Sequence, residues 1–361
     1  MPIIDADAHV VETERTWEFM QGEDAKYRPQ LVALPDANPR PFVWMVDGKV
    51  RFRVNNATLT PEDLLGVSDR QGRNVVTNQD AREMRDVSAR VSHMDQLGID
   101  IEVLHNSFFI HRVTFREEAE VPICRSYNRW LADIWQQGGG RLRWTCVPPV
   151  TNIAESLNEV RFGKEHGAAG VAMRGIELDK ALVDPYFYPI YEEAQRLDLP
   201  IVLHTGCGNS DFCDLYDGAN DPGGGLARFN SPSVVFCHQL MMSELTTLFP
   251  TLRWGIVEAG SQWLPWVIND ARHSYKTAGR KWPEDGFAAF RTWVACMTNE
   301  DMHLVMKYAG EDRILIGTDY GHTDTSAEVD AIQVFQRTSG LDPRVVKKVL
   351  EDNPGELYAI N

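Results

Sequence analysis

The sequence predicts an α/β fold, a (β/α)8 TIM barrel with insertions at the carboxyl-terminal face of its strands. Eight short apolar segments recur along the 361 residues, and each ends in polar or glycine residues. Most are followed by a segment whose apolar residues are spaced by three and four, as in helices that alternate with parallel strands. Eight is also the number of strands that closes such a barrel. The expected strands are 3–9, 99–105, 142–148, 168–174, 200–204, 233–238, 253–258 and 314–319.

Helical spacing between these segments supports the barrel. It is found at 80–97, 121–135, 153–166 and 185–197, where we expect helices of the outer ring. Three further stretches do not fit the strands and helices of a minimal barrel. We therefore expect one domain over 1–361 with insertions at the mouth of the barrel. These insertions lie near 14–79, near 205–232 with its Pro-Gly-Gly-Gly run at 222–225, and near 263–310, which is helical in pattern.

Composition restricts the partners of the protein. The 36 Lys and Arg residues are outnumbered by 52 Asp and Glu, and the net charge of -16 disfavours nucleic acid. The six cysteines are dispersed, the first residues lack a basic signal region, and no apolar run approaches the roughly 18 residues of a membrane span. We therefore expect a cytoplasmic enzyme that acts on a small molecule. The apolar segment 345–358 either caps its own barrel or packs in a homodimer.

The last residues of the expected strands indicate where the chemistry lies. In TIM barrels the carboxyl ends of the strands surround a single pocket. Seven of the eight terminal residues are polar or ionisable, although the segments themselves are apolar. These terminal residues are His9, His105, Pro148, Arg174, His204, His238, Glu258 and Asp319.

Four of the residues near strand ends suit a metal site. Asp7 and His9 are two positions apart on one strand, so their side chains point the same way. Together with His204 and Asp319 they form a mixed nitrogen and oxygen set suited to Zn, Mn or Fe(II). The alternative for any single histidine is a hydrogen-bonded packing role. We expect one divalent ion, with a binuclear site as the alternative.

A proton-transfer group must accompany the metal. His238, expected at the end of the strand after His204, is placed for that role, and Asp319 could combine metal binding with proton transfer. Glu258 either binds a second ion or orients His238 as a hydrogen-bond acceptor. Glu12 is a further candidate for a second ion.

Two residues are candidates for substrate binding. Arg174 ends the fourth expected strand and could bind an anionic carboxylate or phosphate, or it could pair with Glu177 or Asp179. His105 either contacts the substrate or closes the floor of the pocket. The expected substrate is therefore a small, anionic molecule.

The motifs around these residues resemble the amidohydrolase superfamily, in the branch that includes aminocarboxymuconate-semialdehyde decarboxylase and aromatic-acid decarboxylases. The resemblance implies that Asp7, His9, His204 and Asp319 bind the metal and that His238 is the acid/base. Asp7 differs from the His or Glu common at the first ligand position. Strand four offers Met173 and Arg174 where binuclear members have a carboxylated Lys or a Glu, which favours one ion unless Glu258 or Glu12 recruits another. The motifs are IIDADAH, VLHTG, VFCH, VEAGSQWLPWV, LIGTDYGH, MDQLGID, YNRWLAD and DNPGELY.

Three functions remain open from the sequence. We expect a hydrolase, in which a metal-activated water attacks an amide, ester or thioester of a small organic acid. The alternative is a non-oxidative decarboxylase of an aromatic or unsaturated carboxylic acid, which would use the same metal ligands. A non-catalytic binding barrel is the third, although none of the four expected ligands is missing.

Overall fold

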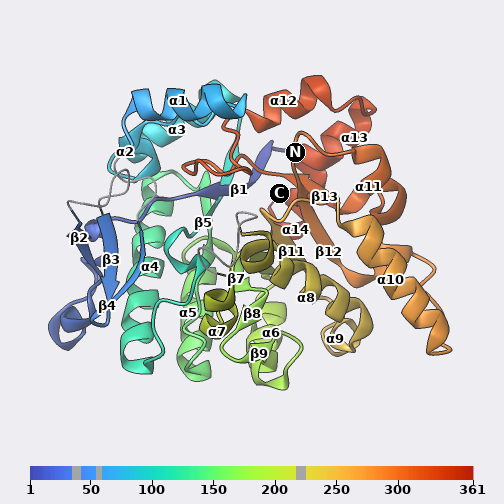
Figure 1. Cartoon of the computed structure of the whole chain (residues 1–361), viewed down its shortest axis with the longest axis horizontal. Helices are drawn as coiled ribbons and strands as arrows, with labels where there is room; N and C mark the ends of the chain where they lie inside the picture. The colour runs from blue at the N-terminus through green and yellow to red at the C-terminus, as the bar shows by residue number, and fades with distance from the viewer. Residues whose placement is uncertain (35–41, 54–58, 217–224, 361) are drawn as a thin grey trace.

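A parallel eight-stranded barrel forms the centre of the protein. The structure, a computed structural model, describes residues 1–34, 42–53, 59–216 and 225–360. Neighbouring strands follow the order β1-β5-β6-β7-β10-β11-β12-β13, and helices surround them, as the sequence predicted (Figure 1). The barrel strands are β1 (Ile4–His9), β5 (Ile101–His105), β6 (Leu142–Cys146), β7 (Ala168–Arg174), β10 (Ile201–His204), β11 (Trp254–Val257), β12 (Thr292–Cys296) and β13 (Ile314–Ile316).

The first and last strands meet through the segment that follows β13. The His9 N–H donates to the Tyr320 carbonyl at 3.0 Å, and the Asp319 N–H donates to the Asp7 carbonyl at 2.8 Å. Gly317 allows this approach, because a Cβ at that position would lie 2.3 Å from the Cβ of Asp7. The closure of the barrel therefore places Asp319 beside Asp7.

Helices cover the outside of the barrel, and the C-terminal segment covers its amino end. Leu357, Tyr358 and Ile360 share a buried cluster with residues inside the barrel, and the Tyr358 hydroxyl donates to the Ala6 carbonyl at 2.7 Å. The segment 345–358 thus packs against its own barrel. The α-helices are α1 (Pro61–Gln71), α2 (Gln79–Arg82), α3 (Val87–Leu97), α4 (Glu117–Gln137), α5 (Ile153–Glu165), α6 (Tyr188–Arg196), α7 (Ser210–Leu215), α8 (Ser231–Met242), α9 (Leu245–Leu248), α10 (Leu264–Thr277), α11 (Met302–Ala309), α12 (Ala331–Thr338), α13 (Pro343–Lys347) and α14 (Asn353–Tyr358).

One expected strand was wrong, and one strand was missed. Residues 233–238 belong to helix α8, whose buried residues include Ser233, Phe236, Cys237 and Leu240. This spacing is helical, but a six-residue apolar run is too short to distinguish a strand from a buried helix. The missing strand is β12, which lies within the expected insertion 263–310 between α10 and α11. As a result, β11 and not 233–238 follows β10 in the sheet.

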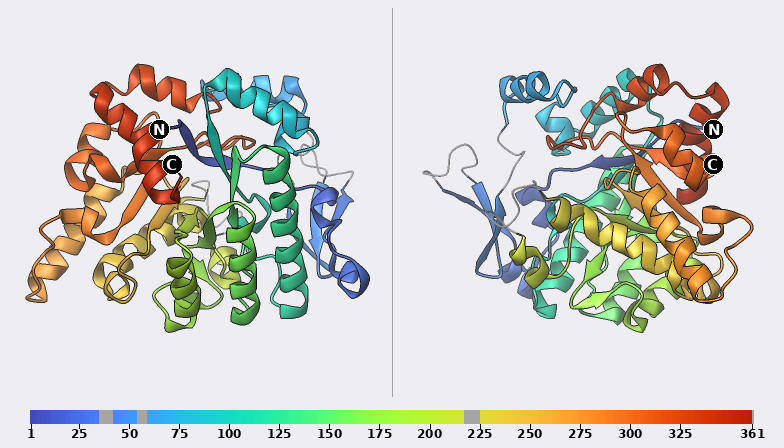
Figure 2. Two further views of the ribbon diagram at one scale, coloured as in Figure 1. Left: turned by 180° about the vertical axis from the view of Figure 1, so that it is seen from behind. Right: turned by 45° about the vertical axis from the view of Figure 1, so that its right-hand side comes forward.

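The expected insertion 14–79 contains a small antiparallel sheet. Its strands are β2 (Gln30–Ala33), β3 (Phe42–Val46) and β4 (Lys49–Arg53). Figures 1 and 2 show this sheet at one side of the barrel, beside α4. Trp44 of β3 packs against Phe108, which follows β5, with 5.6 Å between the ring centroids. The sheet is thereby attached close to the carboxyl ends of the barrel strands.

The expected insertion 205–232 follows β10. It contains α7 and the π-helical turn η6 (Leu226–Asn230), whereas residues 222–224 of the glycine-rich run lie outside the described residues. A two-stranded ribbon of β8 (Ile176–Glu177) and β9 (Lys180–Ala181) lies after β7. Within the described parts of the chain, no helix combines the length and apolar character that crossing a membrane requires.

Candidate metal centre and substrate cavity

Acidic and imidazole side chains converge at the carboxyl ends of four barrel strands. Asp7 and His9 belong to β1, and His204 ends β10. Glu258 follows β11 directly, and Asp319 lies three residues beyond β13. Glu258 and Asp319 have φ angles of +60° and +50°, a left-handed conformation that side chains other than glycine rarely adopt. Such strain is typical of functional sites, where the surrounding structure holds it.

The side-chain atoms of this group lie close together. His204 Nε2 is 2.6 Å from Glu258 Oε2 and 2.8 Å from His9 Nε2. His9 Nε2 lies 3.6 Å from Asp7 Oδ1, 3.4 Å from Glu258 Oε2 and 3.5 Å from Asp319 Oδ1. The His9 ring is therefore the centre of the group.

These side chains form two overlapping sets that could hold a metal ion. The ligand atoms within each set lie within 4.8 Å of one another, and every residue in both sets is buried. The structure thus brings Asp7, His9 and His204 together as expected, but it adds Glu258 to them and places Asp319 in the second set. The first set is Asp7, His9, His204 and Glu258, and the second is His9, Glu258, Asp319 and His322.

Buried atoms without hydrogen bonds support a cation at this place. Asp7 Oδ1, Glu258 Oε2, Asp319 Oδ1 and His322 Nδ1 are all buried, and apart from their close contacts within this group they have no hydrogen-bond partner. Buried polar groups are normally satisfied, so four such atoms in one cluster require an explanation. Carboxylate oxygens and imidazole nitrogens are ligands that Zn, Mn and Fe share. The residues present therefore fit a divalent metal ion.

The pKa values of the group show how costly its charges are. Burial raises the pKa of Asp7 to about 8, and it raises the pKa of Asp319 well above its ordinary range. Burial opposes the charged form of His204, but the neighbouring Glu258 carboxylate raises the pKa of that imidazole to about 9. A divalent cation would reverse these shifts by stabilising the ionised carboxylates and the neutral imidazoles.

His322 belongs to this site, although the sequence analysis did not select it. Its ring stacks on His9 with 3.9 Å between centroids, and its Nδ1 lies 2.7 Å from Asp319 Oδ1. Its Nε2 lies 2.7 Å from the Ser107 hydroxyl. The signal was present in the motif LIGTDYGH, where His322 follows Asp319 by three residues. A search limited to the last residues of strands passes over it.

Glu12 and His105 lie beside the group but outside both metal-binding sets. Glu12 is buried, and its Oε1 accepts the Ser107 N–H at 3.0 Å. Burial raises the pKa of Glu12 to about 7. His105 is fully buried behind His9 and His204, with ring centroids 6.1 and 5.5 Å away, and is not among the described residues that line the main cavity. Its expected role, in contact with the substrate or at the floor of the pocket, stays a prediction.

Arg174 pairs with an acid of its own chain. Its Nε donates to Glu177 Oε1 at 2.9 Å, and its Nη1 donates to the Phe109 carbonyl at 3.0 Å. Arg174 lines a separate cavity of about 20 Å³, which has room for little more than a water molecule. The alternative of pairing with Glu177, which the sequence left open, is thus the one found.

The position expected for His238 was wrong. His238 lies on helix α8 instead of at a strand end, and its Nε2 is 3.0 Å from Asp270 Oδ2. It belongs to neither of the sets that could bind a metal and does not line the main cavity among the described residues. Glu258 does lie at its expected strand end, and because β11 is the strand next to β10, Glu258 and not His238 is the neighbour of His204.

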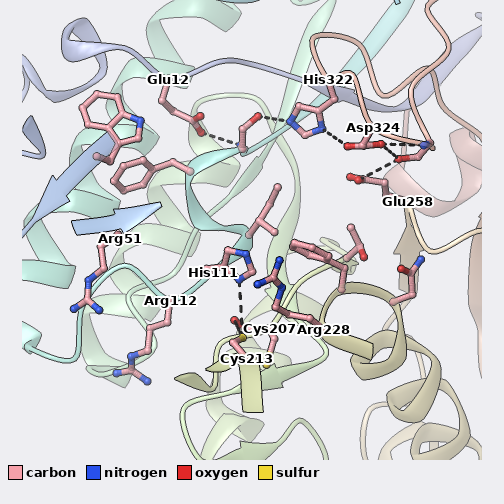
Figure 3. Close-up of a pocket in the computed structure, with 18 of the residues that line it drawn as sticks. Glu12, Arg51, His111, Arg112, Cys207, Cys213, Arg228, Glu258, His322 and Asp324 are labelled. Carbon is pink, nitrogen blue, oxygen red and sulfur yellow. Dashed lines mark hydrogen bonds and ion pairs between the residues drawn. The ribbon is translucent and has the colours of Figure 1, made fainter. Parts of the chain in front are cut away.

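A cavity of about 910 Å³ opens beside the metal-binding sets, and its two ends differ in charge (Figure 3). At the end that we call the acidic end, the lining residues include Glu12, Glu258, His322 and Asp324. The other end, which we call the arginine wall, consists of Arg51, Arg112 and Arg228. Aromatic and apolar residues, among them Trp44, Phe108, Ile110 and Phe229, also line this cavity.

Comparisons with known proteins agree with the expected resemblance. A family described as amidohydrolase matches residues 4–360. A curated relative, the gamma-resorcylate decarboxylase of a Polaromonas species, is 25% identical over 295 residues, which cover 75% of this chain and 87% of the relative.

Solved structures show the same fold. An amidohydrolase from Mycobacterium avium subsp. paratuberculosis superimposes with a TM-score of 0.78 at 18% identity, covering 99% of both chains. A dihydroxybenzoic acid decarboxylase from Polaromonas, with bound manganese and the inhibitor 2-nitroresorcinol, gives a TM-score of 0.67 at 19% identity, covering 100% of this chain and 97% of that one.

These comparisons correct the expected reaction. The sequence analysis favoured a hydrolase, but the curated relative and the manganese-bound structure are both decarboxylases. The metal ligands alone could not separate the two reactions, since both use the same residue types. The expectation of a hydrolase was therefore wrong. The metal in the similar structure is manganese, so the comparisons do not support zinc.

Proposed function

The chain belongs to the amidohydrolase family, and we propose that it is a metal-dependent, non-oxidative decarboxylase of an aromatic or unsaturated carboxylic acid. The observation that carries the proposal is the buried group of Asp7, His9, His204, Glu258 and Asp319, which meets a large cavity through Glu258. The likeness to decarboxylases selects this reaction among those that the group could support.

Asp7, His9, His204 and Asp319 are the proposed ligands of one divalent ion, with Glu258 and His322 in contact with them. Manganese is the proposed metal, because it is bound in the similar dihydroxybenzoic acid decarboxylase and suits oxygen-rich ligand sets. When bound, it would hold the carboxylate, or an adjacent hydroxyl, of the substrate.

The chain itself must then supply a proton. Decarboxylation breaks the bond to the carboxyl carbon, releases CO₂ and adds one proton to the carbon that remains. Asp319 is the proposed proton donor, because it belongs to the metal-binding group and one of its two carboxyl oxygens could carry a proton while the other binds the metal. The rings of Trp44, Phe108 and Phe229 provide apolar walls for an aromatic substrate.

Metal analysis combined with a substrate screen tests this function. Protein loaded with manganese is incubated with aryl and unsaturated carboxylic acids and with aryl esters and thioesters. We expect release of CO₂ from at least one acid, and loss of that activity after treatment with a chelator. Release of free acid from the esters or thioesters, without CO₂ from any acid, would reject the proposal.

A further inference from the structure

We infer that the arginine wall binds a second carboxylate, so that the substrate is an extended acid with an anionic group at each end. This inference rests on the proposed function, because it assumes that the first carboxylate is held at the acidic end. Figure 3 shows Arg51 and Arg112 on the opposite side of the cavity from Glu258, His322 and Asp324, with Arg228 between the two sides, near His111.

Three separate segments contribute to the arginine wall. Arg51 belongs to β4 of the small sheet, Arg112 lies after β5, and Arg228 belongs to the turn η6. Outside the acidic end, Asp214 is the one acid among the described residues that line the cavity. Asp47 also acts on Arg51, and Glu120 and Glu177 act on Arg112, but none of these three acids lines the cavity among the described residues. The cavity lining at this end therefore carries three arginines and one acid, which favours an anionic ligand.

Arg51 and Arg112 both lie beside the aromatic ring of Phe115. Their guanidinium carbons lie 5.8 and 4.6 Å from the centroid of the Phe115 ring. The ring holds both guanidinium groups in place through cation–π contacts.

The hydrogen bonding of the wall is incomplete at Arg51. Its Nε is buried and has no hydrogen-bond partner, whereas Arg112 Nε donates to the Thr114 carbonyl at 2.8 Å. An unsatisfied buried donor costs free energy, and a carboxylate is the acceptor that best matches a guanidinium. Arg174, which was expected to bind the anion, is by contrast already satisfied by Glu177.

The size of the cavity agrees with an extended ligand. Its volume of about 910 Å³ lies near the top of the range of roughly 300–1,000 Å³ in which proteins bind drug-sized molecules. An acid with a single aromatic ring would fill only part of this space. A substrate with an apolar body between two carboxylates would use both ends.

Calorimetric binding of matched acids tests the inference. The probes are terephthalate against benzoate, and the para,para′-dicarboxylate of biphenyl against biphenyl monocarboxylate, each titrated into manganese-loaded protein. We expect at least one dicarboxylate to bind about 10-fold or more tightly than its monocarboxylate, as a charge-assisted pair would provide. In Arg51→Ala and Arg112→Ala this advantage should shrink, while binding of the monocarboxylate changes little.

The control is Arg116→Ala. Arg116 also lies near the small sheet and pairs with Asp47 at 2.8 Å, but it does not line the cavity among the described residues. This variant should keep the full advantage of the dicarboxylate, and Arg51→Lys should keep part of it. Thermal melting checks that each variant is folded.

Two results would overturn the inference: no dicarboxylate binds more tightly than its monocarboxylate, or the advantage persists when both Arg51 and Arg112 are replaced. Binding is measured without turnover, so it is independent of the proposed reaction. If no acid releases CO₂ but the arginine-dependent advantage is found, the decarboxylase proposal fails and the anion site stands.

Discussion

The two ends of the cavity are built by different parts of the chain. At the acidic end, Glu258 directly follows a barrel strand, and His322 and Asp324 follow the last strand closely. The arginine wall comes instead from β4, from the loop that holds Arg112, and from the turn η6. The barrel thus fixes the chemical end, whereas the segments added to it form the end that we propose to select the substrate. The experiments below test how separate these two ends are.

The largest effect is expected at the metal-binding group. Replacing His204 with Asn removes a nitrogen that lies 2.6 Å from Glu258 and 2.8 Å from His9. We expect the variant to lose bound metal and about 10³-fold or more in turnover, since metal assistance contributes several kcal/mol to a transition state. Metal analysis and CO₂ release measure the two effects. Full metal content with full activity would show that His204 is not a ligand.

The closure of the barrel should be nearly as sensitive. Gly317→Ala places a methyl group 2.3 Å from the Cβ of Asp7, so the strands must move apart. We expect a loss of about 1–3 kcal/mol in the free energy of unfolding, typical of overpacking, together with weaker metal binding. Denaturant unfolding and metal titration measure both.

Gly66→Ala is the matched control for that experiment. Gly66 lies within helix α1, and a Cβ there would meet Arg70 Nη1 at 3.5 Å, an ordinary contact. Because alanine favours helices over glycine by about 1 kcal/mol, this variant should be unchanged or more stable. Equal losses in both variants would remove the special role of Gly317.

Glu12 tests the electrostatic character of the acidic end. Its pKa in the folded protein is about 7, raised by burial from an ordinary value of 4.5. The folded state therefore binds the proton more tightly than the unfolded state. The resulting stabilisation is fully present below pH 4.5 and is lost as the pH rises through about 7.

The variant Glu12→Gln removes this titration while keeping an oxygen that can accept the Ser107 N–H. Between pH 4.5 and 8, the wild type should lose stability relative to the variant by on the order of 3 kcal/mol at most. Unfolding in denaturant across this range measures the difference. Parallel pH dependence in the two proteins would mean that Glu12 does not titrate in this range.

The same contrast explains what the sequence could predict. Seven of the eight strands could be recognised because a buried parallel strand leaves a short apolar run with a polar end. The period-two spacing of Asp7 and His9 likewise indicated that they share a face. The prediction of the eighth strand was wrong because residues 233–238 form an equally apolar run on α8. Over six residues, the spacing of apolar side chains cannot distinguish a strand from a buried helix.

The arginine wall left no comparable signal. Arg51, Arg112 and Arg228 are far apart in the sequence and lie in segments without a regular apolar period. Their proximity depends on how the small sheet and the turn η6 dock at the barrel. Arg174 was a plausible substitute because it ends a strand, but Glu177, three residues later, is close enough to neutralise it.

The smallest effect is expected at His238, where sequence and structure disagree most. Its ring contacts Asp270 on the outer helices, and the two side chains are 32% and 57% exposed. Exposed ion pairs contribute about 0–1 kcal/mol, so His238→Asn should change stability by no more than that. Metal content and turnover should stay near the wild-type values, in contrast to His204→Asn. A 100-fold loss of turnover with normal metal content is instead the result expected of a lost general acid or base. It would mean that α8 moves toward the cavity during catalysis, and the division between a catalytic barrel and its surrounding segments would then no longer hold.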